Sequence, residues 1–314
     1  MIEYLKICRI DHWLKNIFIL FGHAVAIVLL PEAKLTGESI LWIGYSLIPA
    51  CFIASANYIL NEILDAPFDR LHPTKRLRGI PAGKAKVSIL WVMFGCLIVA
   101  GFALAIPLQS TGYTIALALL LLSGLVYNIP PVRLKDKVFL DVIAESFNNP
   151  IRLWLGWFTL EKTLMQPPLG IVLAWWFFGA LLMTGKRYAE FRFIDDPELS
   201  GRYRKSFKSY TEQKLVIAMI TYANLFCFCT GVSMTAYKEL HNLVFVFPMI
   251  VFAIIAYFRL AMSVKGAKLE PEQMLRNPWV IIATVVTAGL AIYLLLAEKD
   301  YTTVFHFWQR MWVK

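Results

Sequence analysis

The feature that most constrains this chain is a series of long stretches without a charged residue. Such stretches extend over residues 39–61, 163–185, 215–237, 240–258 and 277–297. Each is close to the roughly 20 residues that an α-helix needs to cross a bilayer. The charge-free run over residues 87–132 is about twice as long as one span, and Pro107 and Gly112 divide it by a turn. With a shorter run over 16–31 and a polar-interrupted run over 138–158, the sequence predicts an all-α integral membrane protein with nine transmembrane helices.

The composition supports this class. Hydrophobic residues make up 59% of the chain and charged residues 17%, whereas soluble globular proteins carry about 25% charged residues. A soluble helical protein would need polar faces, yet residues 280–296 are apolar on all sides. Cations precede the first run as in a secretory signal, but Asp11 and Lys15 crowd its start and no small-residue cleavage site follows. We therefore expect a retained first span and a single domain over residues 1–314.

The distribution of lysine and arginine predicts the orientation. The loops on one side of nine spans hold 24 of these residues and the loops on the other side hold six. The positive-inside rule then places the N-terminus in the cytoplasm and the C-terminus outside. The cytoplasmic loops would be residues 61–87, 133–138, 186–214 and 264–277, and residues 301–314 would form an interfacial segment on the outer leaflet. The net charge of +10 lies in membrane loops, so we expect a plasma or inner membrane protein and no nucleic acid partner.

Three oxygen-bearing side chains recur every fourth residue near the end of the second span. The spacing of Asn61, Asp65 and Asp69 places them on successive turns of one helical stripe. Such oxygen ligands suit Mg2+, which is usually held by one or two carboxylates together with substrate phosphates. Pro67 is expected to bend the helix and aim both carboxylates at one point. A solvated helix end is the alternative, but the helix macrodipole opposes carboxylates there. We therefore predict Mg2+ on these three residues, with Asp65 and Asp69 as the catalytic pair.

A basic segment follows at once. Lys75, Arg76 and Arg78 supply three cations within four residues. Cations beside a magnesium–carboxylate site are what a diphosphate requires, because the metal bridges some of its oxygens and arginine or lysine neutralises the others.

Further ionisable residues fall inside or directly beside predicted spans. Asp141, Glu145 and Arg152 recur at helical spacing in the fifth span, where ionisable residues are expected to face a polar interior. The alternative is an internal pairing, of Glu145 with Arg152 or of Asp141 with a neighbour, that only locks helices together. Lys15, near the first span, could contact lipid headgroups or face inward to a phosphate. A charged cluster at residues 186–190 directly follows the sixth span.

The first motif resembles the Asn-Asp-x-x-Asp-x-x-x-Asp motif of the UbiA superfamily of intramembrane prenyltransferases, with Glu62 where the family usually has Asp. The flanking sequence motifs resemble those of one branch of this superfamily, the polyprenyl-phosphate (decaprenyl-phosphate) phosphoribosyltransferases. The most specific word is D-R-x-H-P-T-K-R-x-R over residues 69–78. The supporting words are HWLKN at 12–16, RLK at 133–135, Asp141, Arg152 with Gly156, and K-R-x-x-E at 186–190.

The resemblance implies a UbiA-like bundle of nine helices and a Mg2+-dependent enzyme of cell wall arabinan precursor synthesis. Its reaction would transfer 5-phosphoribose from phosphoribosyl pyrophosphate to a polyprenyl phosphate and release pyrophosphate. A homo-oligomer is compatible with the sequence. The substrate-binding residues expected from the motifs and the resemblance are Lys15, Glu62, Arg70, Lys75, Arg76, Arg78, Tyr127, Lys135, Asp141, Arg152, Lys186, Arg187 and Glu190.

The chain also departs from the family pattern. Aromatic prenyltransferases carry a second acidic motif after the sixth span, where this chain has Lys186 to Glu190, with Asp195 and Asp196 further on. Residues 147–150 also differ from the apolar sequence motif expected in this branch of the family. Two alternatives stay open, an aromatic polyprenyltransferase that uses a prenyl diphosphate, and a carrier that binds a lipid phosphate without chemistry. The first would want two acidic motifs, and the second would need no paired carboxylates.

Overall fold

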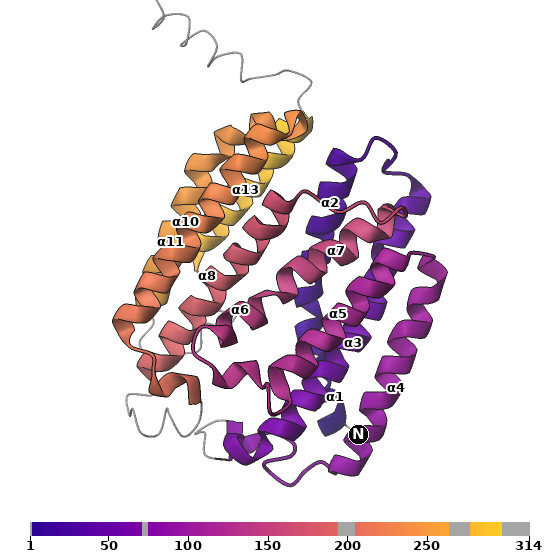
Figure 1. Ribbon diagram of the computed structural model, residues 1–314, viewed down its shortest axis with the longest axis vertical. Helices are drawn as coiled ribbons and strands as arrows, with labels where there is room; N and C mark the ends of the chain where they lie inside the picture. The colour runs from indigo at the N-terminus through magenta and orange to yellow at the C-terminus, as the bar shows by residue number, and fades with distance from the viewer. Residues whose placement is uncertain (1, 71–74, 194–204, 264–276, 297–314) are drawn as a thin grey trace, which may run out of the picture.

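The computed structural model describes residues 2–70, 75–193, 205–263 and 277–296, and every regular element in these ranges is helical (Figure 1). The long helices run side by side along the tall axis of the view and form one bundle. The bounds are α1 Ile2–Ile7, η1 Ile10–Phe18, α2 Ile19–Leu29, α3 Gly37–Asp69, η2 Lys75–Leu77, α4 Val87–Ala105, η3 Ile106–Leu108, α5 Thr111–Asn128, η4 Leu134–Asp136, α6 Leu140–Ser146, α7 Asn148–Leu160, α8 Leu169–Phe193, η5 Lys205–Lys208, α10 Glu212–Ala236, η6 Lys238–Val246, α11 Phe247–Ser263 and α13 Pro278–Leu296.

Eight helical stretches in the described ranges are long and apolar enough to cross a membrane, as a multi-pass membrane protein requires. The ninth predicted span, over residues 138–158, folds instead as two short helices. The 7-residue α6 and the 13-residue α7 meet at Phe147, and neither is long enough to cross alone. Two asparagines and Pro150 follow this junction, and such residues compete with or remove helical backbone hydrogen bonds. The count of nine spans therefore stays a prediction.

The helix that carries the acidic motif is the longest element. α3 has 33 residues, a length of about 50 Å, which exceeds the roughly 30 Å of the hydrocarbon core. Pro67 lies inside this helix and does not end it, because the next turn still closes through the Arg70 amide, which donates to the Ala66 carbonyl at 3.3 Å. The last turns of α3 can therefore extend beyond the apolar layer into the region where charged loops gather.

The described residues form three hydrophobic clusters, the smallest of which joins α1, α3 and α4 around Ile7, Ile59 and Leu90. A second cluster joins α2, α3, α5 and α7 around Ile19, Ile53 and Leu153. The third joins α8, α10 and α11 around Leu181 and Met219. Figure 1 shows α10, α11 and α13 together along the left side and α4 at the opposite edge. The polar site described below lies between these two halves.

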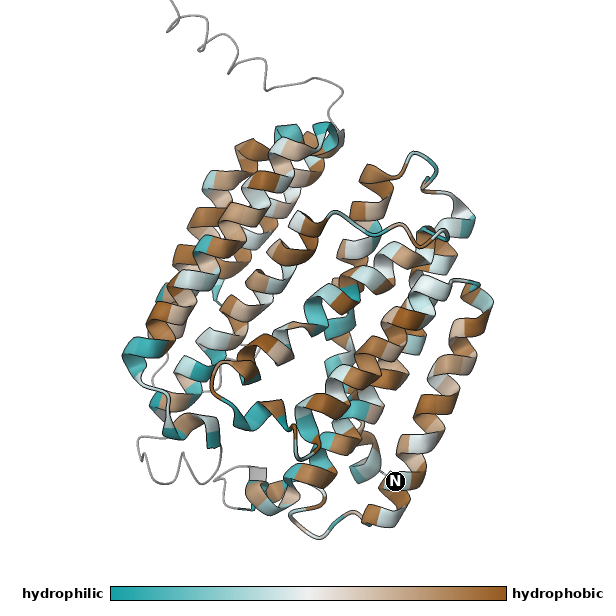
Figure 2. Ribbon diagram, viewed as in Figure 1, coloured by the Kyte–Doolittle hydropathy of each residue, from teal (hydrophilic) through white to brown (hydrophobic). Residues whose placement is uncertain are grey.

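Hydropathy is distributed as a membrane protein requires. Figure 2 shows hydrophobic residues along the outer helices, α4 and α10 among them, and hydrophilic residues at the lower end and at mid-height, where α6 meets α7. The predicted cytoplasmic loops 75–86 and 133–138 both lie at this lower end (Figure 1). The predicted loop 264–277, the C-terminal segment 301–314 and part of loop 186–214 lie outside the described residues.

Candidate active site

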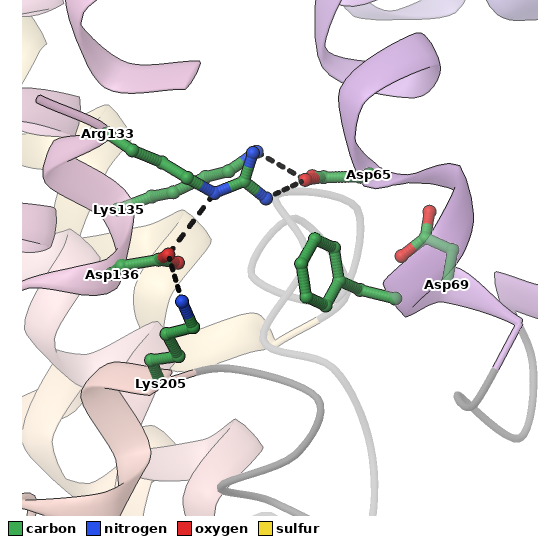
Figure 3. Close-up of a pocket in the computed structure, with 7 residues that line it drawn as sticks. Asp65, Asp69, Arg133, Lys135, Asp136 and Lys205 are labelled. Carbon is green, nitrogen blue, oxygen red and sulfur yellow. Dashed lines mark hydrogen bonds and ion pairs between the residues drawn. The ribbon is translucent and has the colours of Figure 1, made fainter. Parts of the chain in front are cut away.

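The two predicted catalytic carboxylates lie together in the last turns of α3 (Figure 3). Asp69 is buried and Asp65 is half-buried. Both line a small pocket that is completed by Phe68, by the turn after α5 and by η5, with the side chains of Arg133, Lys135, Asp136 and Lys205. Residues that are distant in the sequence therefore surround the acidic motif with cations.

Lys135 places its ammonium group among three oxygen atoms. Its Nζ donates to Oδ1 of Asn128 at 2.7 Å and to Oδ1 of Asn61 at 3.3 Å, and it forms a close ion pair with Oδ1 of Asp65. Arg133 adds a second cation, because its Nη2 lies 3.0 Å from the same Asp65 oxygen. Figure 3 shows both basic side chains converging on Asp65. The site therefore already stabilises positive charge at the predicted metal-binding residues.

The donor chemistry fits Mg2+. The oxygens that surround the Lys135 ammonium come from one carboxylate and two amides, and hard oxygen donors are what Mg2+ prefers. In the part of the chain that the structure describes, no group of three His, Cys, Asp or Glu side chains is placed to hold a metal. Asn61 and Asp65 would therefore supply part of the coordination shell and substrate phosphates the rest, while Asp69, the third predicted ligand, is paired with Arg78.

The basic segment after α3 folds back onto the motif. Nη1 of Arg78 lies 2.6 Å from Oδ2 of Asp69, which is a buried carboxylate. Glu62 points toward this segment and away from the pocket. Its Oε1 accepts from the Ile80 amide at 3.5 Å, and the charge of Arg78 acts on it. Glu62, predicted as a substrate-binding residue, therefore lies against the loop that carries Arg78.

Arg70 and Arg76, two other predicted cations of this segment, do not appear among the described residues that line the pocket. Arg70 and Arg76 are exposed. Lys75 begins η2, and residues 71–74 lie outside the described residues. Arg78 forms an ion pair with Asp69 of the acidic motif.

A second charged cluster is centred on Arg187, which is 2% exposed. Its Nε lies 3.1 Å from Oδ2 of Asp141, its Nη1 lies 3.3 Å from Oε2 of Glu190, and its Nη2 forms a close ion pair with Glu145. Tyr127 joins by donating its hydroxyl to Oε2 of Glu145 at 3.0 Å. The predicted Glu145–Arg152 pair is wrong, because Glu145 pairs with Arg187 on α8. The other predicted pairing, of Asp141 with a neighbour, is present as the Asp141–Arg187 ion pair.

Two side chains near η5 extend this cluster. The Tyr210 hydroxyl donates to Oδ1 of Asp141 at 2.5 Å, and the Ser206 hydroxyl donates to Oδ2 at 3.3 Å. Burial, followed by the charge of Asp141, raises the pKa of Tyr210, so the phenol stays protonated and remains a donor at neutral pH. The segment before α10 is thereby tied to the helix that carries Arg187.

Three predicted substrate-binding cations stand outside the lining of the pocket at Asp65. Arg152 on α7 donates from Nε to Oδ1 of Asn16 at 3.1 Å. Nζ of Lys15 lies 3.3 Å from Nδ1 of His12. Lys186 is half-buried on α8 and acts electrostatically on Tyr58. These residues surround the interior of the bundle at some distance along α3 from Asp65.

Six polar residues of the pocket and of the Arg187 cluster were not predicted as site residues, Asp136 and Lys205 among them. Arg133 and Asn128 stand next to predicted ones, and their positions in the Tyr127–Lys135 segment were the available signal. Ser206 and Tyr210 lie in a charged segment that resembles a solvated surface. Only the tertiary structure brings them to Asp141.

The sequence model of the UbiA prenyltransferase family matches residues 17–281, which is most of the chain. The chain belongs to this family. Among the relatives of this UbiA-family protein is the decaprenyl-phosphate phosphoribosyltransferase of Mycolicibacterium smegmatis, 28% identical over 92% of each chain. The protein of the same name from Mycobacterium tuberculosis is 28% identical over 91% of this chain and 93% of its own.

The fold of this UbiA-family chain is similar to that of a UbiA homolog from Archaeoglobus fulgidus bound to GPP and Mg2+. The TM-score is 0.67 at 18% identity, over 94% of this chain and 100% of the other. The predicted UbiA-like helical architecture is thereby confirmed.

The UbiA-family chain differs from a two-motif prenyltransferase at α8. The position of the second acidic motif holds Lys186, Arg187 and Glu190, and Arg187 is saturated with carboxylates from α6 and α8. Asp195 and Asp196, which might have substituted for that motif, lie outside the described residues. Within the described ranges, the carboxylates that line the pocket are Asp65, Asp69 and Asp136.

Proposed function

We propose that this UbiA-family protein transfers a 5-phosphoribosyl group from phosphoribosyl pyrophosphate to a polyprenyl phosphate. The observation that carries the proposal is the pocket at Asp65 and Asp69, which one metal-type acidic motif shares with Arg78, Arg133 and Lys135. Cations around an acidic pair suit an anionic diphosphate leaving group. The full-length relatives from two mycobacteria carry a matching name.

In this proposal the residues of the pocket have two roles toward the diphosphate, metal binding and charge neutralisation. Asn61, Asp65 and Asp69 would hold Mg2+, which supplies charge stabilisation for the departing pyrophosphate when it is bound. Arg133 and Lys135 now neutralise Asp65, and they can turn to phosphate oxygens when a substrate enters. Arg78, which is paired with Asp69, would likewise turn to phosphate oxygens of the substrate.

The reaction needs no separate base. An oxygen of the acceptor phosphate forms a bond to ribose C1, and the bond from C1 to the pyrophosphate oxygen breaks. The electron pair of the broken bond leaves with pyrophosphate. A phosphate monoester is already anionic near neutral pH, so no proton has to be removed from the attacking oxygen.

The topology is part of the proposal. We infer one domain with nine crossings, the N-terminus in the cytoplasm and α6 with α7 forming the fifth crossing. The water-soluble donor would then reach Asp65 from the cytoplasmic side of a plasma or inner membrane, while the acceptor tail lies in the bilayer between helices. The charge asymmetry of the loops supports this orientation.

An assay with the purified protein in lipid nanodiscs tests the proposal. Labelled phosphoribosyl pyrophosphate, decaprenyl phosphate and Mg2+ should give a labelled lipid, and EDTA should abolish it. Labelled lipid from a prenyl diphosphate and an aromatic acid, with none from phosphoribosyl pyrophosphate, would replace the proposal by an aromatic prenyltransferase. Retention of polyprenyl phosphate without any product would indicate a carrier.

A further inference from the structure

The interior of the bundle contains an arginine with no carboxylate partner in the described ranges. Arg152 is half-buried on α7. Its Nε donates to Oδ1 of Asn16 at 3.1 Å and its Nη1 donates to the Asn148 carbonyl at 3.4 Å. A guanidinium is always charged, and removing it from bulk water without a counter-ion is strongly unfavourable. The position of Arg152 therefore calls for an anion.

The guanidinium is held so that its outer edge stays available. Asn16, which is 2% exposed, donates from Nδ2 to Sγ of Cys51 at 3.1 Å. That bond turns Oδ1 of Asn16 toward Nε of Arg152. Nη2 of Arg152 has no acceptor among the described residues, and Nη1 has one long contact. The two terminal nitrogens can thus donate in parallel, as arginine does to a phosphate.

Tyr58 on α3 faces the same region. It lies within electrostatic range of three cations, Arg152, Arg9 and Lys186, and of one carboxylate, Glu145, which is already bound by Arg187. The Arg9 guanidinium lies 5.1 Å from the Tyr58 ring centroid and fixes the ring. Its hydroxyl has no hydrogen-bond partner within the described ranges. Arg152 and the Tyr58 hydroxyl thus supply a positive charge and a hydrogen-bond donor in the same region.

We propose that Arg152 and Tyr58 form a subsite for a phosphate monoester, separate from the diphosphate pocket at Asp65 and Asp69. This inference rests on the proposed function, because both of its substrates carry such a group, the 5-phosphate of the donor and the phosphate of the lipid. Tyr58 stands seven residues before Asp65 on α3, which is about 10 Å along the helix axis. A subsite at that separation would grip a second phosphate while the first stays at the metal-binding residues.

Substitutions at the two residues test the subsite in the full-length protein in nanodiscs. Tyr58→Phe removes only the hydroxyl, and Arg152→Lys keeps the charge but loses the parallel donors. The matched control is Lys162→Gln, which removes an exposed cation just past the end of α7. The readouts are the KM for phosphoribosyl pyrophosphate, the KM for the polyprenyl phosphate, and calorimetric binding of ribose 5-phosphate and farnesyl phosphate as probes without turnover.

We expect both variants to raise one KM and weaken binding of the matching probe about tenfold, the effect of one hydrogen bond to a charged group. The Mg2+ concentration for half-maximal rate should stay unchanged. A raised donor KM identifies the ribose 5-phosphate as the occupant, and a raised acceptor KM identifies the lipid phosphate. Both KM values and both probe affinities within twofold of the Lys162→Gln control would overturn the subsite. Arg152-dependent probe binding by a protein that forms no lipid-linked ribose would instead overturn the proposed reaction and leave the subsite standing.

Discussion

At the scale of single residues, Asp65 is the side chain on which the cations of the pocket converge. Its Oδ1 binds both Arg133 and Lys135. Asp65→Asn keeps the shape and an acceptor oxygen but removes the charge that would hold Mg2+. We expect formation of the lipid-linked product to fall by at least about 100-fold, as when one preorganised electrostatic contact is lost, while the protein still folds. Product formation by the purified variant over a Mg2+ titration measures this.

The control for that substitution is Glu239→Gln, which neutralises an exposed carboxylate on η6. It should behave as the unsubstituted protein does. Near-normal turnover of Asp65→Asn with an unchanged Mg2+ response would remove Asp65 from the metal site.

Glu62 is the residue at which the family motif is altered. Its hydrogen bond to the Ile80 amide suits a role in holding the loop that carries Arg78. Because Oε1 only just reaches the Ile80 amide, at 3.5 Å, shortening the side chain by one methylene in Glu62→Asp should break the contact. Glu62→Gln keeps the reach and is the matched control. The lost hydrogen bond is worth about 1 kcal/mol, so the Ile80 amide should exchange its hydrogen roughly fivefold faster in the aspartate variant.

Hydrogen exchange followed by mass spectrometry over residues 76–86 separates these variants. The KM for phosphoribosyl pyrophosphate should rise with the exchange rate, since the same loop holds Arg78 on Asp69. Equal exchange in the aspartate and glutamine variants would show that Glu62 does not hold the loop.

At the scale of elements, the crossing of α2 and α7 controls the interior of the bundle. The helices approach so closely that an ideal Cβ on Gly22 would lie 2.9 Å from the Leu153 carbonyl carbon, and one on Gly156 would lie 2.7 Å from the His23 nitrogen. Both obstacles are backbone and cannot rotate away. α7 also carries Arg152, so this crossing sets the depth of the proposed phosphate subsite.

We expect Gly156→Val to destabilise the protein by about 1–3 kcal/mol or more, the usual effect of overpacking, and to abolish activity. Thermal unfolding in detergent, followed by size exclusion, measures the change. Gly95→Ala on α4 is the control, because nothing lies within 4 Å of its added methyl group. A Gly156→Val protein with an unchanged melting temperature would contradict the close crossing.

The junction of α6 and α7 has a similar effect on the site. In one straight helix, Asp141, Glu145 and Arg152 would share a face. The break at Phe147 lets Asp141 and Glu145 reach Arg187 on α8, while Arg152 bonds to Asn16. The break at Phe147 therefore separates the Arg187 cluster, whose charges are paired, from Arg152, which has no carboxylate partner in the described ranges.

At the scale of the whole molecule, the proposed orientation predicts which loops water-soluble reagents reach. Cysteines introduced at the exposed positions Glu32 and Lys162 should react with a membrane-impermeant maleimide on intact cells. A cysteine at the exposed Lys84 should react only after permeabilisation. Each of these single cysteines is placed in a background whose five native cysteines are replaced by alanine or serine.

Labelling that reverses this pattern would invert the topology and place the acidic motif outside the cytoplasm. Labelling of positions 84 and 162 on the same side would mean that the chain crosses an even number of times between them. The α6–α7 pair would then not complete a crossing, and the eight spans found by length would be the full number.

The membrane class of this protein and the position of its acidic motif can be read from the order of its residues alone. Apolar runs, the bias of lysine and arginine among loops, and the four-residue spacing of Asn61, Asp65 and Asp69 are linear patterns that survive without knowledge of packing. The break in the fifth span was not predicted, because its polar residues suit a functional helix as well as an interrupted one. Pro67 was expected to bend α3, and the helix continues through it to Asp69.

The pairing of basic with acidic side chains depends on the tertiary structure and could not be predicted from the sequence. Lys135 and Asp65 are 70 residues apart, and Arg187 and Asp141 are 46 apart. Membrane helices are apolar around most of their circumference, so their sequence carries little information about which face meets which neighbour. The depth and rotation of each helix follow from close approaches such as Gly22 to Gly156. Those contacts leave Arg187 fully paired, Asp65 bound by two cations, and Arg152 without a carboxylate in the described part of the chain.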